Sequence, residues 1–259
     1  MLVMRRDAVR ATPELSVVIP AFNQAREIAA MIRATDDVLQ HAGVRAEIIV
    51  VSDGSNDGTA AIAAGTECAT PLAVLEYTPN EGKGHALTRG SREAAGDWIA
   101  WIDADLDLHP RHLPRFLEAC RDNQLDALVG SKRHPGSLVD YPRKRRVYSA
   151  LYQWLIRTLF RFNVRDTQVG LKVFRSDVLH AVLPRVLVKR YAFDVEVLAI
   201  ARRLGYTRIA EYPIALTYQF SGSGMNPTAV AQALKDTAAI FYRMYLLRWY
   251  DRPSGERAP

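Results

Sequence analysis

The sequence predicts a single α/β domain whose mostly parallel sheet is covered by helices on both faces. Apolar, often β-branched runs alternate with segments of helical periodicity through the first half of the chain. These runs contain few polar residues, as in strands that are buried on both faces. The length of 259 residues, with 49% hydrophobic and 24% charged residues, is ordinary for a globular domain.

The expected elements alternate between strand and helix through the first half. Strands are predicted where apolar runs occur, at residues 15–19, 47–51, 72–76, 97–102 and 126–130. Helices are predicted at residues 25–40, from about 57, 83–95 and 110–122. The less regular second half is expected to hold helices at 144–162, 192–204 and 229–250 and strands at 168–174 and 207–216. Because ligands of such sheets bind beyond the carboxyl ends of the strands, candidate site residues are expected directly after strands.

The start of the chain and its cysteines suggest where the protein works. Residues 1–14 are charged and have no apolar core, so they are predicted to be an extension and not a signal peptide. No segment reaches the roughly 20 uncharged apolar residues of a membrane span, so the chain is expected to be soluble or to lie on a membrane. Cys68 and Cys120 match no metal or redox spacing and are expected to be reduced thiols of a cytoplasmic protein.

Positive charge is concentrated in one segment. The net charge is +6, which suits nucleic acid, anionic lipid or a phosphorylated substrate. Residues 132–165 hold nine Lys or Arg and one acid, a charge of +8, so the rest of the chain carries about −2. The predicted helix 144–162 places basic residues beside Leu151 and Trp154. This pattern is typical of an interfacial helix on anionic lipid, and equally of a core helix with a solvated basic edge.

Three carboxylates, Asp103, Asp105 and Asp107, follow the fourth predicted strand at alternate positions. Like charges close together raise each other's pKa, so such a group is costly unless a cation neutralises it. Mg²⁺ and Mn²⁺ prefer carboxylate oxygens and also coordinate diphosphates. The pattern indicates either a divalent-metal site or a solvated acidic turn, and its place after a buried strand favours the metal site.

Asp53 and Lys83 are two further candidate ligand-binding residues, because each follows a predicted strand or begins a predicted helix. Asp53 follows the second strand, where a carboxylate can accept a hydrogen bond from a base or ribose, although a plain strand-to-helix turn would contain the same residues. Lys83 lies between two glycines at a predicted helix start. That setting suits a phosphate and equally an ordinary helix-entry loop.

Four motifs in this order resemble the inverting GT-A glycosyltransferases of the family that includes cellulose and dolichyl-phosphate sugar synthases. The motifs are Pro20-Ala-Phe-Asn23, residues 52–59, Gly82-Lys83-Gly84 and Asp103-Ala-Asp105. Further along, residues 166–175, 191–198 and 211–214 resemble the dolichyl-phosphate β-glucosyltransferase branch, with the mannosyl-phosphate-dolichol synthases as nearest relatives. The resemblance implies one GT-A catalytic domain at 15–250, with a nucleotide-sugar half at 15–131, an acceptor half at 132–250 and a tail at 251–259.

The resemblance also implies roles for individual residues. The nucleotide sugar is expected at Pro20, Ala21, Asn23, Gln24, Asp53, Lys83, Asp103 and Ala104. A Mg²⁺ or Mn²⁺ ion is expected at Asp105, the direct ligand, and at Asp107. The acceptor is expected at Arg133, Arg145, Ser149, Gln168, Asp194 and Glu196. The catalytic set is then Asp103, Asp105, Arg133 and Arg145.

The chain departs from the family's pattern at two places. Gln24 stands where the family commonly has Glu, so a ribose contact keeps a hydrogen-bond acceptor but loses its charge. Gly222-Ser223-Gly224 stands where the family has Gly-Ser-Lys, so one lysine expected to contact phosphate is missing.

The implied function is transfer of a hexose, with inversion, from a nucleotide sugar to a polyprenyl or dolichyl phosphate. The signatures at 166–168 and 193–196 favour UDP-glucose as the donor, with GDP-mannose next. The protein is expected in the cytoplasm, peripherally associated with an anionic surface of the inner (plasma) membrane and binding no nucleic acid. The predicted helix 229–250 would form a second interfacial element or a homodimer surface.

Two alternatives remain at this point. A glycosyltransferase with a soluble hydroxyl acceptor would need Asp194 or Glu196 as a general base. A non-catalytic nucleotide or nucleic-acid binding module would leave the paired acids Asp103 and Asp105 without a purpose.

Overall fold

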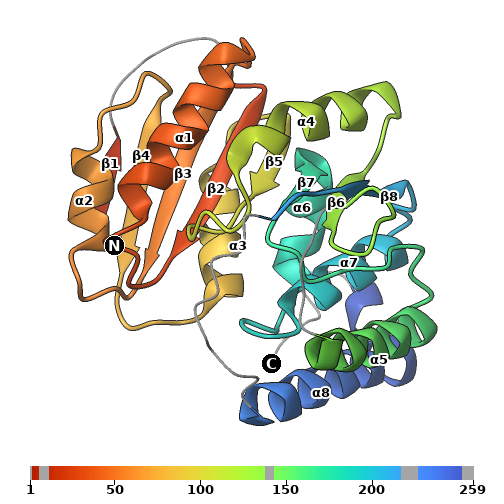
Figure 1. The fold of residues 1–259 in the computed structure, drawn as a ribbon. Helices are drawn as coiled ribbons and strands as arrows, with labels where there is room; N and C mark the ends of the chain where they lie inside the picture. The colour runs from red at the N-terminus through yellow and green to blue at the C-terminus, as the bar shows by residue number, and fades with distance from the viewer. Residues whose placement is uncertain (1, 6–11, 138–142, 217–226, 253–259) are drawn as a thin grey trace.

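The computed structural model describes residues 2–5, 12–137, 143–216 and 227–252, with the backbone alone at 2–5, 143–150 and 227. Within these residues eight strands form one sheet, in the order β1-β4-β3-β2-β5-β7-β6-β8 (Figure 1). The strands are β1 (Leu2–Arg5), β2 (Leu15–Ala21), β3 (Ala46–Asp53), β4 (Leu72–Tyr77), β5 (Trp98–Trp101), β6 (Ala127–Ser131), β7 (Lys172–Arg175) and β8 (Ile209–Pro213).

Helices pack on both faces of the sheet, and each face has its own hydrophobic core. On one face lie α1 (Ile28–His41), α2 (Thr59–Gly65) and α4 (Leu113–Asp122). On the other lie α3 (Lys83–Glu93), α6 (Ser176–Val182), α7 (Phe193–Arg203) and the apolar ends of α5 (Arg143–Phe160) and α8 (Pro227–Phe241). This double cover confirms the predicted fold class and explains why the strands carry few polar residues.

The register of the sheet brings several strand ends together. β2 is the central strand of the first half and pairs in parallel with β3 and with β5. β3 in turn pairs in parallel with β4, up to the pair Asp53 and Tyr77. The residues that follow these four strands therefore meet at one edge of the sheet.

β7 differs from the expected topology because it runs antiparallel to both of its neighbours, β5 and β6. It begins at Lys172, later than the predicted strand at 168–174. The residues before it are held in turns by side chains. Thr167 donates its backbone N–H to Gln153 at 3.3 Å, and Gln168 donates its backbone N–H to Asp166 at 3.3 Å.

The two ends of the chain contain structure that the sequence did not predict. Residues 2–5, expected to be part of an extension, form β1, which pairs antiparallel with β4. The predicted helix 229–250 is broken, because α8 is followed by the π-helical turn η3 (Tyr242–Leu246) and the 3₁₀ turn η4 (Trp249–Asp251). Arg243 and Tyr250 both donate to Glu196, whereas a continuous α-helix would separate these two residues by about 10 Å along its axis.

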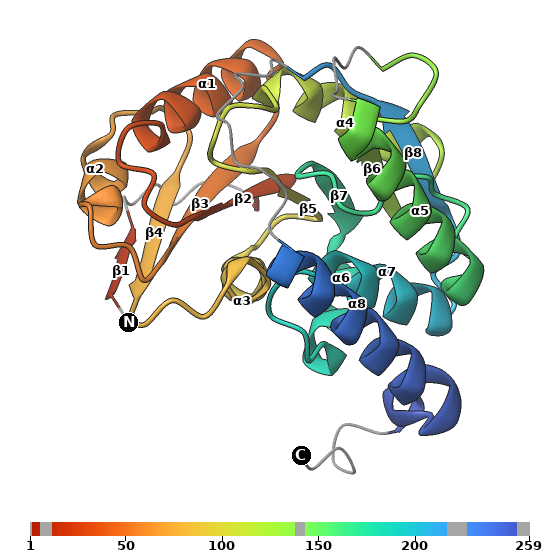
Figure 2. The ribbon, with the colours of Figure 1, turned by 60° about the horizontal axis from the view of Figure 1, so that its bottom comes forward.

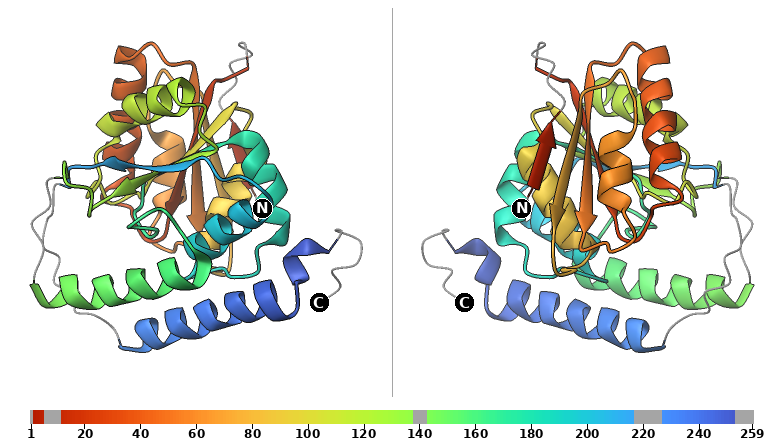
Figure 3. Two further views of the ribbon diagram at one scale, coloured as in Figure 1. Left: turned by 90° about the vertical axis from the view of Figure 1, so that its right-hand side faces the viewer. Right: turned by 90° about the vertical axis from the view of Figure 1, so that its left-hand side faces the viewer.

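Helices α5 and α8 lie side by side at one border of the molecule (Figures 2 and 3). The Tyr152 hydroxyl lies 2.9 Å from Oγ1 of Thr237, and the Tyr245 hydroxyl after α8 donates to the Leu159 carbonyl at 3.1 Å. No helix within the described residues is both long and apolar enough to cross a bilayer.

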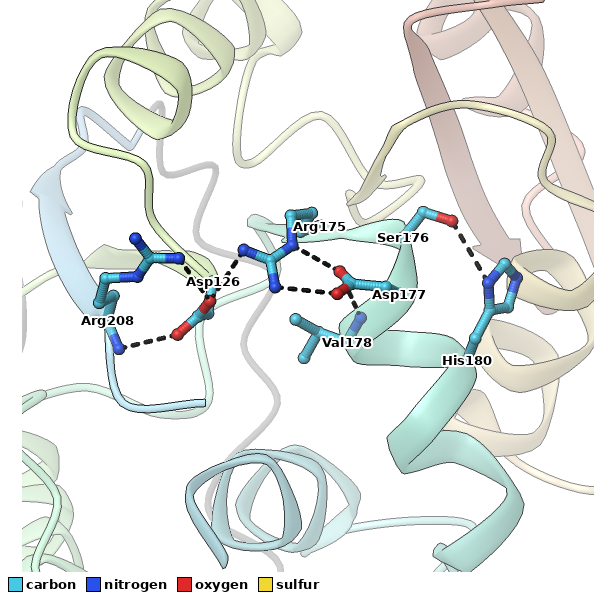
Figure 4. Close-up of polar contacts among 7 residues, drawn as sticks. All are labelled: Asp126, Arg175, Ser176, Asp177, Val178, His180 and Arg208. Carbon is cyan, nitrogen blue, oxygen red and sulfur yellow. Dashed lines mark hydrogen bonds and ion pairs between the residues drawn. The ribbon is translucent and has the colours of Figure 1, made fainter. Parts of the chain in front are cut away.

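A buried carboxylate fastens three strands at the edge where β6 and β8 begin (Figure 4). Asp126 accepts hydrogen bonds from the backbone N–H of Arg208 at 3.0 Å and from the Arg175 guanidinium at 3.1 Å. Arg175 also binds Asp177 through two hydrogen bonds. The side chain of Asp126 is only 6% exposed, whereas that of Asp177 is 56% exposed.

Replacement of this carboxylate should destabilise the protein. Asp126→Ala leaves the backbone N–H of Arg208 without its acceptor in a largely buried position and takes one of two carboxylate partners from Arg175, so we expect the free energy of unfolding to fall by about 1–3 kcal/mol. Asp177→Ala removes an exposed partner of the same arginine and should cost less than about 1 kcal/mol. Urea denaturation followed by circular dichroism measures both values. Equal losses for the two variants would contradict the role given to Asp126.

Candidate active site

A cavity of about 520 Å³ opens beyond the carboxyl ends of β2, β3 and β5. Its walls come from the loops after β2, β4 and β5, from the end of β3, from the start of α3, from Gln168, and from residues just before and within the first turn of α7. The lining residues are Pro20, Ala21, Phe22, Gln24, Asp53, Asn80, Gly82, Lys83, Asp103, Ala104, Asp105, Gln168, Arg190, Tyr191 and Asp194. Most of the residues expected to bind the donor therefore share one cavity.

Asp53 organises the loop that follows β4. It is 3% exposed, and its carboxylate accepts the backbone N–H groups of Glu81 and Gly82, each at 2.8 Å. The Asn80 amide donates to the same carboxylate at 3.0 Å. Three donors on one carboxylate hold this loop against the end of β3. Contact between Asp53 and a nucleobase stays a prediction.

The loop after β2 is held by the segment 52–59. Asn23 accepts the backbone N–H of Asn56 at 3.1 Å, and the backbone N–H of Gln24 donates to Thr59 at 2.9 Å. Gln24 lines the cavity, as do Pro20 and Ala21, but Asn23 does not. The role of Asn23 in the structure is to join two loops.

Lys83 and Asp103 form an ion pair inside the cavity. Burial opposes charge on both groups, but the Asp103 carboxylate raises the pKa of Lys83, and the Lys83 ammonium lowers the pKa of Asp103. A Cβ atom at Gly170 would collide with the Asp103 carboxylate, so glycine is needed there. The pair brings the start of α3 close to the end of β5.

Asp194 and Glu196 lie on different sides of α7. Asp194 lines the cavity and pairs with Lys172, which is 2% exposed, at 2.9 Å. Glu196 is fully buried outside the lining and accepts from the backbone N–H groups of Leu187 and Val188 at 2.9 and 2.6 Å. The structure therefore separates two acids that the sequence placed together in the acceptor site.

Asp105 is the carboxylate of the cavity that its neighbours do not neutralise. Its one hydrogen bond within the described residues comes from the backbone N–H of Asp107, at 3.2 Å. Partial burial, and then the carboxylates of Asp103 and Asp107, raise the pKa of Asp105. Asp107 itself lies outside the cavity lining.

The donor set at Asp105 fits a divalent cation. Mg²⁺ or Mn²⁺ bound there would relieve the repulsion between Asp105 and Asp103, and carboxylate oxygen is a ligand that both ions prefer. Within the part of the chain that the structure describes, no group of three or more His, Cys, Asp or Glu is placed to hold a metal. A cation at Asp105 would therefore need further ligands from a substrate, as a diphosphate supplies.

The structure brings together only part of the expected acceptor site. Gln168 lines the cavity and donates to the Tyr191 carbonyl at 3.1 Å. Arg133 follows β6 and lies outside the lining. Arg145 and Ser149 belong to α5, but their side chains lie outside the described residues. Their contacts with an acceptor stay predictions.

Five residues of the lining were not among the expected site residues, namely Phe22, Asn80, Gly82, Arg190 and Tyr191. Asn80 follows β4, so its position after a strand was a signal that could have identified it. Arg190 and Tyr191 come from the loop between η2 (Leu183–Arg185) and α7, which reaches the cavity only through tertiary packing.

Comparison with known proteins agrees with the fold. Residues 16–183 match the family model described as "Glycosyl transferase family 2". AglD, a glycosyltransferase of Haloferax volcanii, is 36% identical over 211 residues, which is 80% of this chain but only 34% of that protein. The undecaprenyl-phosphate mannosyltransferase of Micrococcus luteus is 31% identical over 84% of this chain and 89% of its own.

One further relative and one solved structure agree with this comparison. The dolichyl-phosphate beta-glucosyltransferase of Dictyostelium discoideum is 28% identical over 91% of this chain and 76% of its own. The glucosyl-3-phosphoglycerate synthase of Mycobacterium tuberculosis, solved with Mn²⁺, UDP and phosphoglyceric acid, shares the fold. It aligns with a TM-score of 0.63 at 21% identity, over 89% of this chain and 78% of its own. The chain therefore belongs to glycosyl transferase family 2 and is a glycosyltransferase with a GT-A fold.

Proposed function

We propose that this chain transfers a hexose from a nucleotide sugar to a polyprenyl phosphate at a membrane surface, with inversion and with Mg²⁺ or Mn²⁺. The observation that carries the proposal is the match over 89% of an undecaprenyl-phosphate mannosyltransferase, joined to a cavity that holds one uncompensated carboxylate, Asp105. UDP-glucose is the favoured donor, on the signatures at 166–168 and 193–196, and GDP-mannose is the second candidate.

In the proposed reaction the donor occupies the cavity. Asp53 and the loop that it holds would orient the nucleoside, and Lys83 would lie beside the diphosphate. Asp105 would hold the cation, which when bound stabilises the departing nucleoside diphosphate. Asp103 keeps Lys83 in place through their ion pair.

The nucleophile would be a phosphate oxygen of the lipid, which is already anionic at neutral pH. Such a nucleophile needs orientation but no strong general base. This agrees with the carboxylates on α7, because Asp194 pairs with Lys172 and Glu196 is occupied by four donors. A soluble hydroxyl acceptor would need one of these two carboxylates as a base, and neither is free of partners.

The acceptor would approach from the basic segment 132–165. Arg133, Arg145 and Ser149 are the residues that we propose for its phosphate. On α5 the side chains of Leu151 and Trp154 are each 63% exposed, which suits insertion into the headgroup region of a bilayer. Together these features support a protein that lies on the membrane that contains its acceptor.

A direct assay tests the proposal. The purified protein is incubated with polyprenyl phosphate, Mg²⁺ or Mn²⁺ and either UDP-[¹⁴C]glucose or GDP-[¹⁴C]mannose, and the label in the organic phase is counted. We expect label in the organic phase with UDP-glucose and less with GDP-mannose. Label that enters a water-soluble hydroxyl acceptor, with none in the lipid, would favour the soluble-acceptor alternative.

Asp105→Asn should separate catalysis from folding. Loss of the charge that holds the cation should lower turnover by about two orders of magnitude, the scale of one strong electrostatic contact in a transition state. Stability without metal should not fall, because the substitution removes one negative charge from a cavity lined by four carboxylates.

Sugar transfer and thermal melting in EDTA measure the two effects. EDTA should also abolish wild-type turnover, and added Mg²⁺ or Mn²⁺ should restore it. Asp107→Asn shows whether Asp107 is a second metal ligand. A loss of turnover equal to that of Asp105→Asn would indicate that Asp107 also binds the cation. Full wild-type activity in EDTA would contradict the metal assignment.

Binding to a bilayer should depend on the exposed apolar side chains of α5. Each basic residue near an anionic surface contributes on the order of 1 kcal/mol, and this attraction weakens in salt, whereas burial of Leu151 and Trp154 does not. The wild type should therefore float with anionic liposomes at low salt and detach only partly at high salt. The double variant Leu151→Glu, Trp154→Glu should not float.

Ile62→Glu provides the matched control. Ile62 is 38% exposed on α2, which lies on the side of the molecule away from α5 (Figure 1). This variant should float as the wild type does, and both variants should keep their affinity for UDP. Flotation that is equally weak for Ile62→Glu and for the double variant would argue against α5 as the contact surface.

A further inference from the structure

Arg190 belongs to the loop before α7, and its side chain packs against the start of α3 in the cavity assigned to the donor. The backbone N–H of Gly84 donates to the carbonyl of Lys189 at 2.9 Å, so the loop before α7 rests on the first turn of this helix. A Cβ atom at Gly82 would lie 2.7 Å from Cγ of Arg190 and 2.7 Å from the Lys189 carbonyl. Only glycine at position 82 leaves room for the loop in this place.

The partner of Arg190 is a neutral group. Its guanidinium donates to Oδ1 of Asn80 at 3.1 Å, and the amide nitrogen of Asn80 is bound to Asp53. The neighbouring Lys189 differs, because it forms an ion pair with Glu81 and does not line the cavity. Within the described residues Arg190 makes no ion pair, so its charge in the cavity is not neutralised by a carboxylate.

The charges that line the cavity explain why a cationic side chain without an acidic partner is important for binding a diphosphate. Four carboxylates and two cationic side chains, Lys83 and Arg190, line the described cavity. Lys83 already pairs with Asp103. A nucleoside diphosphate would add more negative charge beside these carboxylates, and a cation at Asp105 would balance only part of it. Arg190 is then the cationic side chain of the lining that remains available to the diphosphate.

The chemistry of an arginine suits this task. The planar guanidinium offers several N–H donors and binds phosphate oxygens in pairs. The first turn of the eleven-residue helix α3 adds the positive end of a helix dipole at the same place. The amide of Asn80 holds the guanidinium beside this turn without reducing its charge.

We propose that Arg190 binds the diphosphate of the donor nucleotide sugar, together with Lys83 and the first turn of α3. The proposal depends on one part of the proposed function, a donor that is a nucleoside diphosphate sugar. It is independent of the acceptor and of the membrane.

Equilibrium binding tests this role without turnover. Dissociation constants are measured with Mn²⁺ for UDP and uridine, and for GDP and guanosine, by calorimetry and, for weak ligands, by NMR titration. Arg190→Gln should weaken the preferred nucleoside diphosphate by about 10- to 100-fold, the scale of one charge-assisted contact. The affinity for the matching nucleoside should change by less than about twofold. Arg190→Lys should recover part of the loss.

Lys189→Gln is the matched control, since it removes a positive charge from the adjacent residue outside the lining. Its affinity for UDP or GDP should stay within about twofold of the wild type. If Arg190→Gln lowers the affinity for the diphosphate and for the nucleoside equally, Arg190 supports the loop and does not contact phosphate. This result would overturn the proposal. So would unchanged UDP and GDP binding with a raised KM for polyprenyl phosphate, because Arg190 would then belong to the acceptor.

The wild type distinguishes failure of this inference from failure of the proposed function. If it binds UDP or GDP but moves no sugar to a lipid, the acceptor assignment fails, and the Arg190→Gln comparison still decides the role of Arg190. If it binds neither nucleotide, the nucleotide-sugar donor and the role of Arg190 are both overturned.

Discussion

Repulsion among four carboxylates in one cavity is the constraint on which the rest of the site depends. Three of the four are compensated, each from a different part of the chain. Asp53 binds the N–H groups of the loop after β4, Asp103 pairs with Lys83, and Asp194 pairs with Lys172. These contacts hold the start of α3, the end of β5 and the first turn of α7 around one space. Among the residues that the structure describes, Asp105 alone lacks such a partner, which agrees with the proposed cation at this carboxylate.

A fifth carboxylate, Glu196, connects the cavity with the surface helices. It is fully buried and binds the backbone of Leu187 and Val188, just before Arg190, on one side. On the other side it binds Arg243 and Tyr250, which follow α8. A buried charge is tolerated only when its hydrogen bonds are satisfied, so both segments are fixed by the same group. The position of Arg190 therefore depends on a contact that reaches the end of α8.

Much of the donor site could be predicted from the sequence because it follows strands. The apolar runs at 15–19, 47–51 and 72–76 identified β2, β3 and β4. Asp53 is the last residue of β3, and Asp103 and Asp105 stand just after β5. Asp194 and Glu196 could not be told apart in this way, since residues two apart on a helix face different directions, and only packing decides which one reaches the cavity. Arg190 carried no local signal either. Its place depends on Gly82 and Gly84, about a hundred residues earlier, which let its loop lie on α3.

The distribution of charge agrees with two anionic substrates that arrive by separate routes. Among the charged residues that line the cavity, four carboxylates outnumber two cationic side chains, so a diphosphate would bind there only together with a cation and the positive groups near α3. The segment 132–165 carries a charge of +8, and a lipid phosphate would need no metal there. If these opposite charges were mixed in one pocket, the basic residues would pair with the carboxylates. The two proposed anionic substrates would then compete with those carboxylates for the basic side chains. In the sequence the acids follow the early strands and most of the bases lie around α5, which supports separate places for the donor and the acceptor of the proposed reaction.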